Sequence, residues 1–375
     1  MSGRECFNVV IVRFSGEIGI KGSWTRRHTE LRLLNNIRQV LRRAEIPFKK
    51  AIRRNARIIV ETEKAEEAAS RLSRVFGVSS TSPASETTSS LDDIVRGSLQ
   101  LAGYNLKKGV SFAVKCKRTG NHPYTSMDVC RRVGAEILEA FPELDLRVDL
   151  EKPEFTLGIE VRDERAYIYT EVIKGVGGFP VGTQPPVIGL IDGGFKSLVA
   201  SWMIMKRGCR VVPLHVEYPP LTNGETKRLV VEGAELLFEY SVGFPRKLYT
   251  VKVDRKEFPE EADRLLFTRL IYRIAEAIAR KEKAEGIVTG EMLNGEENTL
   301  DVICMLDKEA RSMPVYRPLI GLSEAEVREK AEKMGIEVEV FPERFPSPIR
   351  SVKVPDSQIE EIVTEALKNT EVINL

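Results

Sequence analysis

Residues 185–208, PPVIGLIDGGFKSLVASWMIMKRG, join an apolar run to a glycine turn and then to an amphipathic segment. A strand, a tight glycine turn and a helix start, in this order, form the phosphate-binding loops of parallel sheets. Strand-like segments RVVPLHVEY, KLYTVKV and GIVTGE follow, separated by helical patterns over 197–207, 224–241 and 261–283. This alternation predicts a parallel sheet with helices on both faces.

The turn itself reads Asp192-Gly193-Gly194-Phe195-Lys196-Ser197 and comes close to two phosphate-binding motifs. A Walker A loop, GxxxxGK[ST], would fit the glycine spacing from Gly189 to Gly194, but Phe195 intrudes before the lysine. The PP-loop, SGGxDS, is used by enzymes that split ATP into AMP and pyrophosphate. Against it, Asp192 replaces serine and Lys196 replaces aspartate, while Gly193, Gly194 and Ser197 remain.

The two replacements reverse the charges around the diglycine. Asp192 places a negative charge where phosphate oxygens would lie, which is unfavourable. Lys196 places a positive charge where a carboxylate would help to hold Mg²⁺. One interpretation is a loop that still binds an anion but has lost metal-assisted adenylation. The other is that Asp192 or Ser197 simply caps the helix.

The first part of the chain is strongly basic. A length of 375 residues indicates two or three domains, and the net charge is only +2. Between Arg4 and Arg57, however, fourteen Lys and Arg face four Asp and Glu, a net charge of +10. From Gly321 to the end, seven basic residues face twelve acidic ones, a net charge of −5. This asymmetry predicts an anionic partner for the first part.

Strand, helix, strand and helix patterns over 7–16, 25–44, 56–62 and 63–77 predict a small α+β unit. The Ser/Thr-rich stretch SSTSPASETTSS, 79–90, reads as a linker. A second unit follows, with helices at 91–103 and 126–141 and strands at 109–118, 146–151, 155–161 and 165–173. The Gly/Pro-rich stretch 174–186 is the clearest domain boundary.

The segments GVGGFPVGTQ, DGGFKSLVASWMIMKRGCRVVPLHVEY, VTGE and PVYRPLIGLSEAEV together resemble the tRNA 4-thiouridine synthetase family (ThiI). FSGEIGIKG with its arginine-rich helix resembles that family's ferredoxin-like domain, and FAVKCKRTGNH resembles a THUMP domain, an RNA-binding module. The resemblance implies an α/β multidomain fold. Its parts would be an α+β ferredoxin-like domain (1–78), an α/β THUMP domain (79–175) and a parallel-sheet PP-loop domain of the adenine nucleotide alpha hydrolase type (176–375).

The resemblance also implies a nucleotide site that holds ATP with Mg²⁺. Besides the loop residues Asp192, Gly193, Gly194, Lys196 and Ser197, the family's contacts correspond to Leu190, Ile191, His215, Val216, Arg269 and Gly290. A glutamine of the family falls near Asn298, in a run that is one residue shorter and more acidic here. No metal ligated by the protein alone is expected.

The cysteines that carry out the family's sulfur chemistry are not found at the corresponding positions of this sequence. Archaeal-type members carry a CxxC pair whose positions correspond to Arg264 and Phe267, and the family's C-terminal cysteine region aligns with FPERFPSPIRSVKVP, which has none. We expect no rhodanese-like extension. The five cysteines, Cys6, Cys116, Cys130, Cys209 and Cys304, are scattered, and Cys209 and Cys304 are predicted to be buried structural residues.

Lysine and arginine neutralise RNA phosphates, so basic side chains of the first two domains are the candidate RNA contacts. They are Arg26, Arg27, Arg32, Lys49, Lys50, Arg53 and Arg54 in the first domain, and Lys115, Lys117, Arg118 and Asn121 in the second. The alternative is an ordinary solvated charged surface. His28 and His122 are predicted to lie at the surface or to face the RNA.

On this chemistry we expect a tRNA-binding family member whose sulfurtransferase activity is lost or altered. The alternative is an active ATP-dependent tRNA uridine 4-sulfurtransferase, connected to tRNA modification and thiamine biosynthesis. The expected partners are tRNA, a sulfur donor protein or an active paralogue, and a second copy in a homodimer. The sequence shows no signal peptide and no apolar run of the roughly 18 residues that cross a bilayer, which predicts a cytoplasmic protein.

Overall fold

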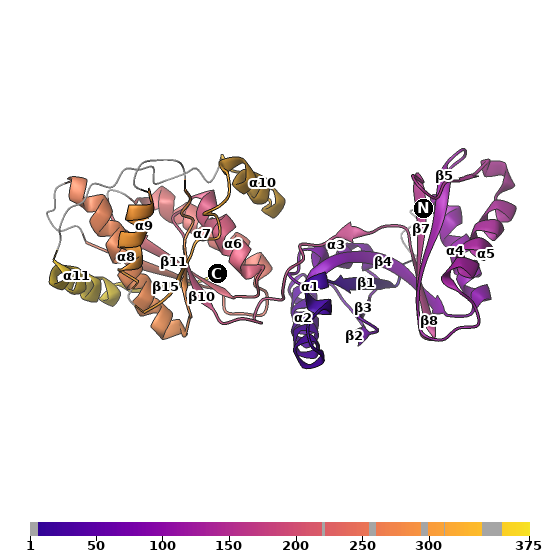
Figure 1. Ribbon diagram of the computed structural model, residues 1–375, viewed down its shortest axis with the longest axis horizontal. Helices are drawn as coiled ribbons and strands as arrows, with labels where there is room; N and C mark the ends of the chain where they lie inside the picture. Colours follow the sequence, from indigo (N-terminus) through magenta and orange to yellow (C-terminus); the bar gives the residue numbers. More distant parts are fainter. Residues whose placement is uncertain (1–6, 220–221, 255–259, 294–298, 311, 340–354) are drawn as a thin grey trace. The chain divides into compact units, whose positions relative to one another are not determined.

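The computed structural model describes residues 7–219, 222–254, 260–293, 299–310, 312–339 and 355–375. It divides into two compact units, Met1–Pro180 and Val181–Leu375 (Figure 1), which are described separately below.

The first unit has the element order β1 (Val9–Phe14), α1 (Gly16–Gly19), α2 (Ser23–Arg43), β2 (Lys50–Arg54), β3 (Arg57–Glu61), α3 (Ala65–Ser73), β4 (Val78–Thr88), α4 (Leu91–Asn105), β5 (Ser111–Thr119), α5 (Ser126–Ala140), η1 (Pro142–Leu144), β6 (Arg147–Val148), β7 (Phe155–Arg162), β8 (Arg165–Tyr169) and β9 (Ile173–Lys174). Within the described residues these strands form one sheet in the order β2-β3-β1-β4-β8-β7-β5-β6, with β9 paired to β4.

The predicted linker at 79–90 is wrong, because most of it is the long strand β4. Residues 78–84 of this strand pair with β1, and residues 85–88 pair with β8. A Ser/Thr-rich strand can be buried because its hydroxyls find partners: Thr81 donates to the carbonyl of Ala69, and Ser82 accepts from Arg13. One strand therefore belongs to both halves of the first unit, as Figure 1 shows.

Helices cover one face of the sheet in each half. One apolar core joins α2 and α3 to β1 and β3 through residues such as Leu33, Ile37 and Val10, and another joins α4 and α5 to β5 and β7 through Ile94, Val133 and Ile159. Because side chains alternate along a strand, Val9, Ile11, Ile59, Ala84 and Tyr167 form a third cluster that contains no helical residue. The helix-free faces of the two halves meet there.

The second unit contains β10 (Val187–Leu190), α6 (Phe195–Met205), β11 (Val211–Glu217), α7 (Gly224–Tyr240), β12 (Lys247–Lys252), α8 (Glu260–Glu282), β13 (Ile287–Val288), α9 (Thr299–Asp307), β14 (Val315–Tyr316), α10 (Glu324–Met334), α11 (Asp356–Lys368) and β15 (Thr370–Asn374). The sheet order among the described residues is β14-β13-β10-β11-β12-β15. All pairs are parallel except β12 with β15, so the predicted parallel sheet is confirmed.

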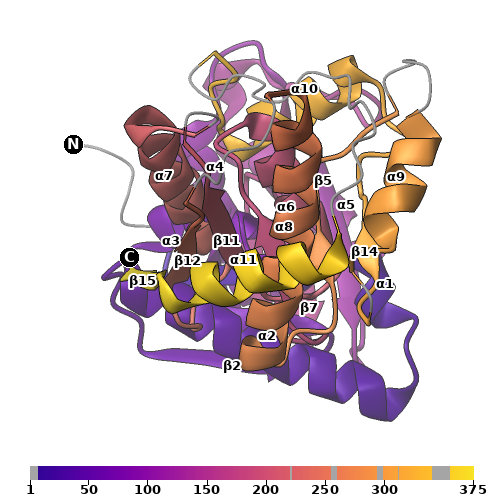
Figure 2. The ribbon, with the colours of Figure 1, turned by 90° about the vertical axis from the view of Figure 1, so that its left-hand side faces the viewer.

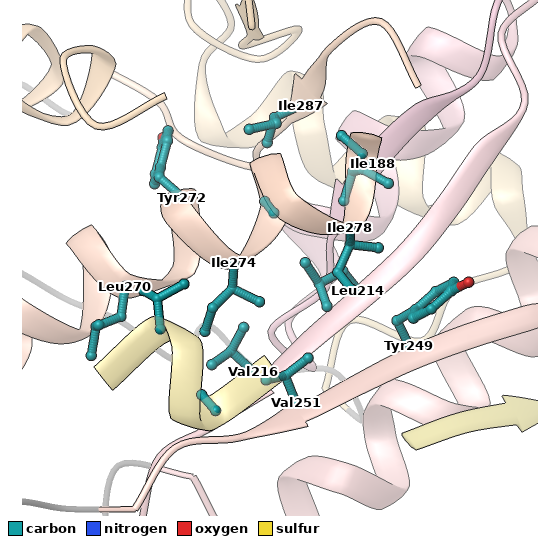
Figure 3. Close-up of a cluster of buried hydrophobic side chains, with 14 of the residues drawn as sticks. Ile188, Leu214, Val216, Tyr249, Val251, Leu270, Tyr272, Ile274, Ile278 and Ile287 are labelled. Atoms are coloured by element: carbon teal, nitrogen blue, oxygen red, sulfur yellow. The ribbon is translucent and has the colours of Figure 1, made fainter. Parts of the chain in front are cut away.

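Helices α8 and α11 cover one face of this sheet (Figure 2). Their apolar residues, including Leu270, Ile274 and Ile278, pack on Leu214 and Val216 of β11, as Figure 3 shows. Gly189 points to the opposite face, where a Cβ atom would lie 2.9 Å from Ser201 Oγ of α6. The two-sided covering explains why the strands are apolar throughout and do not alternate. No helix in the described part of the chain is long and apolar enough to cross a membrane.

Candidate nucleotide and RNA sites

The glycine turn joins the carboxyl end of β10 to the start of α6, as the sequence predicted. Ile191 continues the pairing with β11 by donating its backbone N–H to the carbonyl of Leu214 at 2.9 Å. Gly193 then adopts a φ of +85°, a backbone conformation that residues other than glycine rarely take. Gly194 is the N-cap of α6, and no side chain bonds to the helix from that position. The loop thus has the backbone form that a phosphate site needs.

Asp192 occupies the donors of this loop with its own carboxylate. Its Oδ1 accepts the backbone N–H of Gly194 at 2.9 Å and the hydroxyl of Ser197 at 2.6 Å. This contact is the one that the second interpretation describes, because the Asp192 carboxylate closes the turn at the helix start. A phosphate oxygen that used these two donors would have to displace Asp192.

Lys196 lies in the first turn of α6 and ties the loop to α10. Its Nζ is 2.9 Å from Oε2 of Glu324, the first residue of that helix. The Arg328 guanidinium, one turn further along α10, lies 5.3 Å from the centre of the Phe195 ring. No group of three or more His, Cys, Asp or Glu that could hold a metal ion occurs among the described residues. With a lysine where the PP-loop has its carboxylate, these side chains fit ATP phosphates better than a Mg²⁺ ion held by the protein.

Gly290 follows β13 and packs directly against the start of α6. A Cβ atom on this residue would lie 2.8 Å from the Ser197 nitrogen and 2.9 Å from the Lys196 carbonyl carbon. The neighbouring Glu291 is held by Arg317, with Nε and Oε2 2.5 Å apart, and accepts the Tyr272 hydroxyl at 2.9 Å. The end of β13 therefore forms a fixed wall beside the loop, and only glycine fits there.

His215 lies at the carboxyl end of β11 and is buried, with an exposed fraction of 2%. Its Nδ1 is 2.8 Å from the carbonyl oxygen of Ile191, and because a carbonyl only accepts, Nδ1 carries the proton. Burial lowers the pKa of His215, so the ring is neutral and Nε2 is a hydrogen-bond acceptor. Within the described structure this Nε2 is buried without a partner. An amino group of a ligand would satisfy it.

The other predicted nucleotide residues that the structure describes divide into two groups. Ile191 and Val216 are buried and Leu190 is half-buried, so their side chains belong to the core beside the loop. Arg269 is engaged elsewhere, with Nε 2.6 Å from Glu309 Oε1 and Nη2 2.9 Å from Asp356 Oδ1. Asn298 lies outside the described residues. The structure thus gathers 190–197, His215 and Gly290, and it pairs Arg269 with acidic side chains.

The predicted RNA residues on α2 and its neighbouring strand β2 are partly paired with acids. Glu30, which is buried, contacts Arg26 Nε at 2.8 Å and Arg53 Nε at 2.9 Å. Arg27 is exposed and Arg32 is half-buried on the same helix. The predicted residues Lys49 and Lys50 pair with Glu63 at 3.9 Å and with Glu61 at 2.7 Å, while Arg54 donates to the Tyr167 hydroxyl at 3.4 Å.

The remaining predicted RNA residues lie on β5 and in the loop after it. Lys115, Lys117 and Asn121 are exposed. Arg118 donates to the carbonyl of Gly120 at 2.9 Å and lies 3.2 Å from Nδ1 of His122. His122 Nε2 lies 2.6 Å from a carbonyl oxygen, that of Asp163, so it donates, and Nδ1 accepts from Arg118. These contacts hold the basic loop in one conformation.

Comparisons with known proteins agree across the whole chain. The family model described as "Thiamine biosynthesis protein (ThiI)" matches residues 182–367, the "THUMP domain" model matches 88–171, and the "ThiI ferredoxin-like domain" model matches 9–82. The "Probable tRNA sulfurtransferase" of Saccharolobus solfataricus is 33% identical over 380 residues, covering 98% of this chain and 96% of that protein. The "Probable tRNA sulfurtransferase" of Thermococcus kodakarensis is 35% identical and covers 90% of each.

This chain belongs to the ThiI family of tRNA sulfurtransferases.

Two solved structures have a similar fold over most of the chain. The crystal structure of a 4-thiouridine synthetase–RNA complex with bound ATP matches with a TM-score of 0.81 and 27% identity, covering 98% of this chain and all of that one. The crystal structure of PH1313 from Pyrococcus horikoshii matches with a TM-score of 0.71 and 34% identity, covering 88% of this chain and all of that one. The expected combination of ferredoxin-like, THUMP and parallel-sheet parts is confirmed.

The cysteines of this ThiI-family chain are not arranged as the sequence suggested. Cys304 on α9 is exposed and Cys209 is half-buried, so the prediction that both are buried is wrong. The run VICML around Cys304 is helical, and a helix that is apolar on one face leaves its other face in water. Burial raises the pKa of Cys116 to about 12, which suppresses its thiolate. Cys6 lies outside the described residues.

The positions that correspond to the family's CxxC pair hold no thiol. Phe267 is buried and stacks on Tyr218 with 5.1 Å between ring centres, so it is part of the core. The Arg264 side chain and the region FPERFPSPIRSVKV lie outside the described part of the chain.

Sequence reasoning missed two features. Glu160 is completely buried among three arginines, a contact between distant strands that no local pattern reveals. Trp24 is exposed to 78%, although a tryptophan in a helix normally suggests burial. The exposure of Trp24 could have been predicted from the helical periodicity, because Trp24 lies off the apolar face formed by Leu34, Ile37 and Leu41.

Proposed function

We propose that this chain is an ATP-dependent tRNA sulfurtransferase, which activates a uridine of tRNA with ATP and then replaces its O4 oxygen with sulfur. The observation that supports this most is the similarity over nearly the full length to proteins named tRNA sulfurtransferases, combined with a glycine loop that keeps its backbone form. A solved relative of this length was crystallised with RNA and ATP. This similarity favours an active sulfurtransferase, which the sequence analysis gave as the alternative. It argues against a family member that has lost the activity.

ATP would lie over the diglycine at the carboxyl ends of β10 and β11. The triphosphate would take the N–H groups of Gly194 and the first turn of α6, after displacing the Asp192 carboxylate. The Nε2 of His215 would accept a hydrogen bond from an amino group, which the adenine base provides. Gly290 keeps that side of the site open.

The chemistry needs two displacements. The uridine O4 attacks the α-phosphorus of ATP, and pyrophosphate leaves. A sulfur nucleophile then attacks C4 of the activated uridine, the C4–O4 bond breaks, and AMP leaves with the oxygen. Because Phe267 occupies one position of the family's thiol pair, we propose that sulfur comes from a donor outside the chain. Sulfide would give 4-thiouridine directly. The terminal sulfur of a partner protein's persulfide would first attack C4, and a second thiol of that partner would then cleave the S–S bond and form a disulfide with the donor cysteine.

The first unit would bind the tRNA through basic side chains on the helix-free side of its sheet, of which Lys115 and Lys117 are exposed and Arg54 is half-buried. Lys115 and Lys117 project from β5, and Arg54 lies on β2, on the helix-free side of the same continuous sheet. Lysine and arginine give an affinity that depends on salt, whereas the rigid spacing of the strands selects a folded shape. Two copies of the chain forming a dimer remain a prediction of the resemblance.

One specific observation favours a second candidate, a tRNA-binding family member without adenylation. Asp192 already occupies two donors of the cradle, and Lys196 replaces the carboxylate of the PP-loop. Such a protein would act on tRNA as a chaperone or as the partner of an active enzyme.

The experiment that separates the two combines the chain with tRNA, ATP, Mg²⁺ and sulfide, and measures pyrophosphate and 4-thiouridine. We expect both products. The matched variant Asp192→Ser with Lys196→Asp restores the sequence SGGFDS. Activity in this variant alone, with unchanged tRNA binding in both proteins, would establish the second candidate.

A further inference from the structure

The start of α2 exposes two large apolar side chains that fold stability does not explain. Trp24 is exposed to 78% and Ile20, just before the helix, to 85%. The other tryptophan, Trp202, is exposed to only 7%. Leaving an indole in water forgoes the free energy that burial would give, so an exposed tryptophan on a folded domain suggests a ligand that covers it.

Trp24 is held in place by its own helix. His28, one turn later, stacks on it with 5.8 Å between the ring centres and 11° between the ring planes. A flat ring that is already ordered on one side loses little conformational entropy when a second flat group binds on the other. The pair therefore forms a platform on which another ring can stack.

The surroundings of this platform are cationic. Residues 23–32, the part of α2 that surrounds Trp24, contain three arginines and one glutamate, a net charge of +2, and the first turn has no acidic residue. The glutamate, Glu30, is buried and contacts both Arg26 and Arg53. Arg27 and Lys21 are exposed on either side of Trp24 in the sequence. Such a surface repels a second copy of itself and attracts a polyanion.

We propose that Trp24, ordered by His28, is a stacking platform for an unpaired nucleobase of the bound RNA, with Arg27 and Lys21 neutralising the neighbouring phosphates. Proteins bind unpaired bases by stacking them on aromatic rings within basic surfaces. The proposal rests on the proposed tRNA binding and adds to it a specific contact in the first domain. It requires the RNA to present a base outside a helix at this place.

Fluorescence tests this directly, because the chain has two tryptophans and Trp202 is buried against Tyr240. Titration with tRNA should quench the emission of Trp24 and leave that of Trp202 unchanged. In Trp24→Phe the quenching should disappear while the affinity stays within roughly twofold, since phenylalanine also stacks. In Trp24→Ala the affinity should fall roughly tenfold.

Tyr104→Ala is the matched control, because Tyr104 is another exposed aromatic residue, on α4. It should leave the tRNA affinity unchanged. Binding of tRNA without quenching, and with full affinity in Trp24→Ala, would refute the platform and leave the proposed function intact. Absence of tRNA binding by the unaltered chain would refute both. Trp24 emission that changes with protein concentration and not with RNA would overturn the platform in favour of a protein partner.

Discussion

Glu160 of β7 accepts a hydrogen bond from Nε of Arg13 of β1 at 2.6 Å, although 147 residues separate the two in the chain. Glu160 is completely buried, and Arg57 and Arg162 contact its other oxygen at 3.0 and 2.6 Å. Arg13 and Arg57 come from the ferredoxin-like half, and Glu160 and Arg162 come from the THUMP half. One carboxylate thus joins the two parts that would bind RNA.

Replacing Glu160 by glutamine keeps the shape but leaves three arginines without their counter-charge. Removing one partner of a buried ion pair costs about 3 kcal/mol or more, so we expect a loss of this size in the free energy of unfolding of the first unit. Urea titration measures it. Glu61→Gln, which breaks a partly exposed pair with Lys50, is the control and should cost well under ~1 kcal/mol. Equal effects of the two variants would contradict the central role of Glu160.

The same cluster predicts sensitivity to acid. Burial by itself would raise the pKa of Glu160, but the charges of Arg13 and Arg57 outweigh it and lower the pKa from 4.5 to about 2. The stabilisation is complete above the unfolded pKa near 4.5 and disappears as the pH falls through the folded value near 2. The stability difference between the unaltered chain and Glu160→Gln should therefore shrink between these values. A difference that is constant from pH 5 to 2 would contradict this.

The fold could be predicted from the sequence wherever a local pattern reports on packing. The apolar runs of β10 and β11 and the glycine turn at 192–194 indicated the parallel sheet. The segment 79–90 could not be assigned in this way, because Ser and Thr are typical of both linkers and strands. Its strand is decided by partners far away in sequence, such as Arg13 for Ser82.

Asp192→Ser tests whether the carboxylate competes with phosphate for the loop. Replacing the carboxylate by a hydroxyl removes a negative charge from the loop and frees the backbone N–H of Gly194. ATP should therefore bind at least roughly tenfold more tightly. Calorimetry with ATP and Mg²⁺ measures the change. Asp92→Ser, at an exposed aspartate of the other unit, should have no effect. Weaker binding in Asp192→Ser would instead make Asp192 a contributor to the site.

Gly290→Ala tests the wall beside the loop. The added methyl group would meet the Ser197 backbone at 2.8 Å, which must displace the first turn of α6. We expect ATP affinity to fall roughly tenfold and stability to fall by about 1–3 kcal/mol. Gly321→Ala is the matched control, because nothing lies within 4 Å of its added atom. Normal ATP binding by Gly290→Ala would mean that the nucleotide site does not need the close packing of residue 290 against the start of α6.

Of the four cysteines that the structure describes, Cys304 is the thiol that a reagent should reach first, because it is exposed, whereas Cys116 is half-buried and its pKa is raised to about 12. Modification at pH 8 followed by mass spectrometry should label Cys304 well before Cys116. With sulfide as the donor, Cys304→Ser should thiolate tRNA at the unaltered rate. A loss of activity greater than tenfold would mean that the Cys304 side chain takes part in the reaction with sulfide, which the account does not expect.

The site was less predictable than the fold. The loop, His215 and Gly290 are adjacent because parallel strands end at one edge of the sheet, and this follows from the sequence. The contacts of Asp192, Lys196 and Arg269 do not follow from it. Each depends on which oppositely charged or hydrogen-bonding group the folded chain brings near, such as Glu324 for Lys196 and Glu309 for Arg269.

The most direct measurement of the central claim follows the fate of ATP during a reaction with tRNA. The unaltered chain is incubated with tRNA, Mg²⁺, sulfide and ATP labelled in its α-phosphate, with a second sample lacking tRNA. The account predicts AMP and pyrophosphate in equal amounts, formed only with tRNA and matched by new 4-thiouridine. ATP that remains intact while tRNA is bound would contradict it.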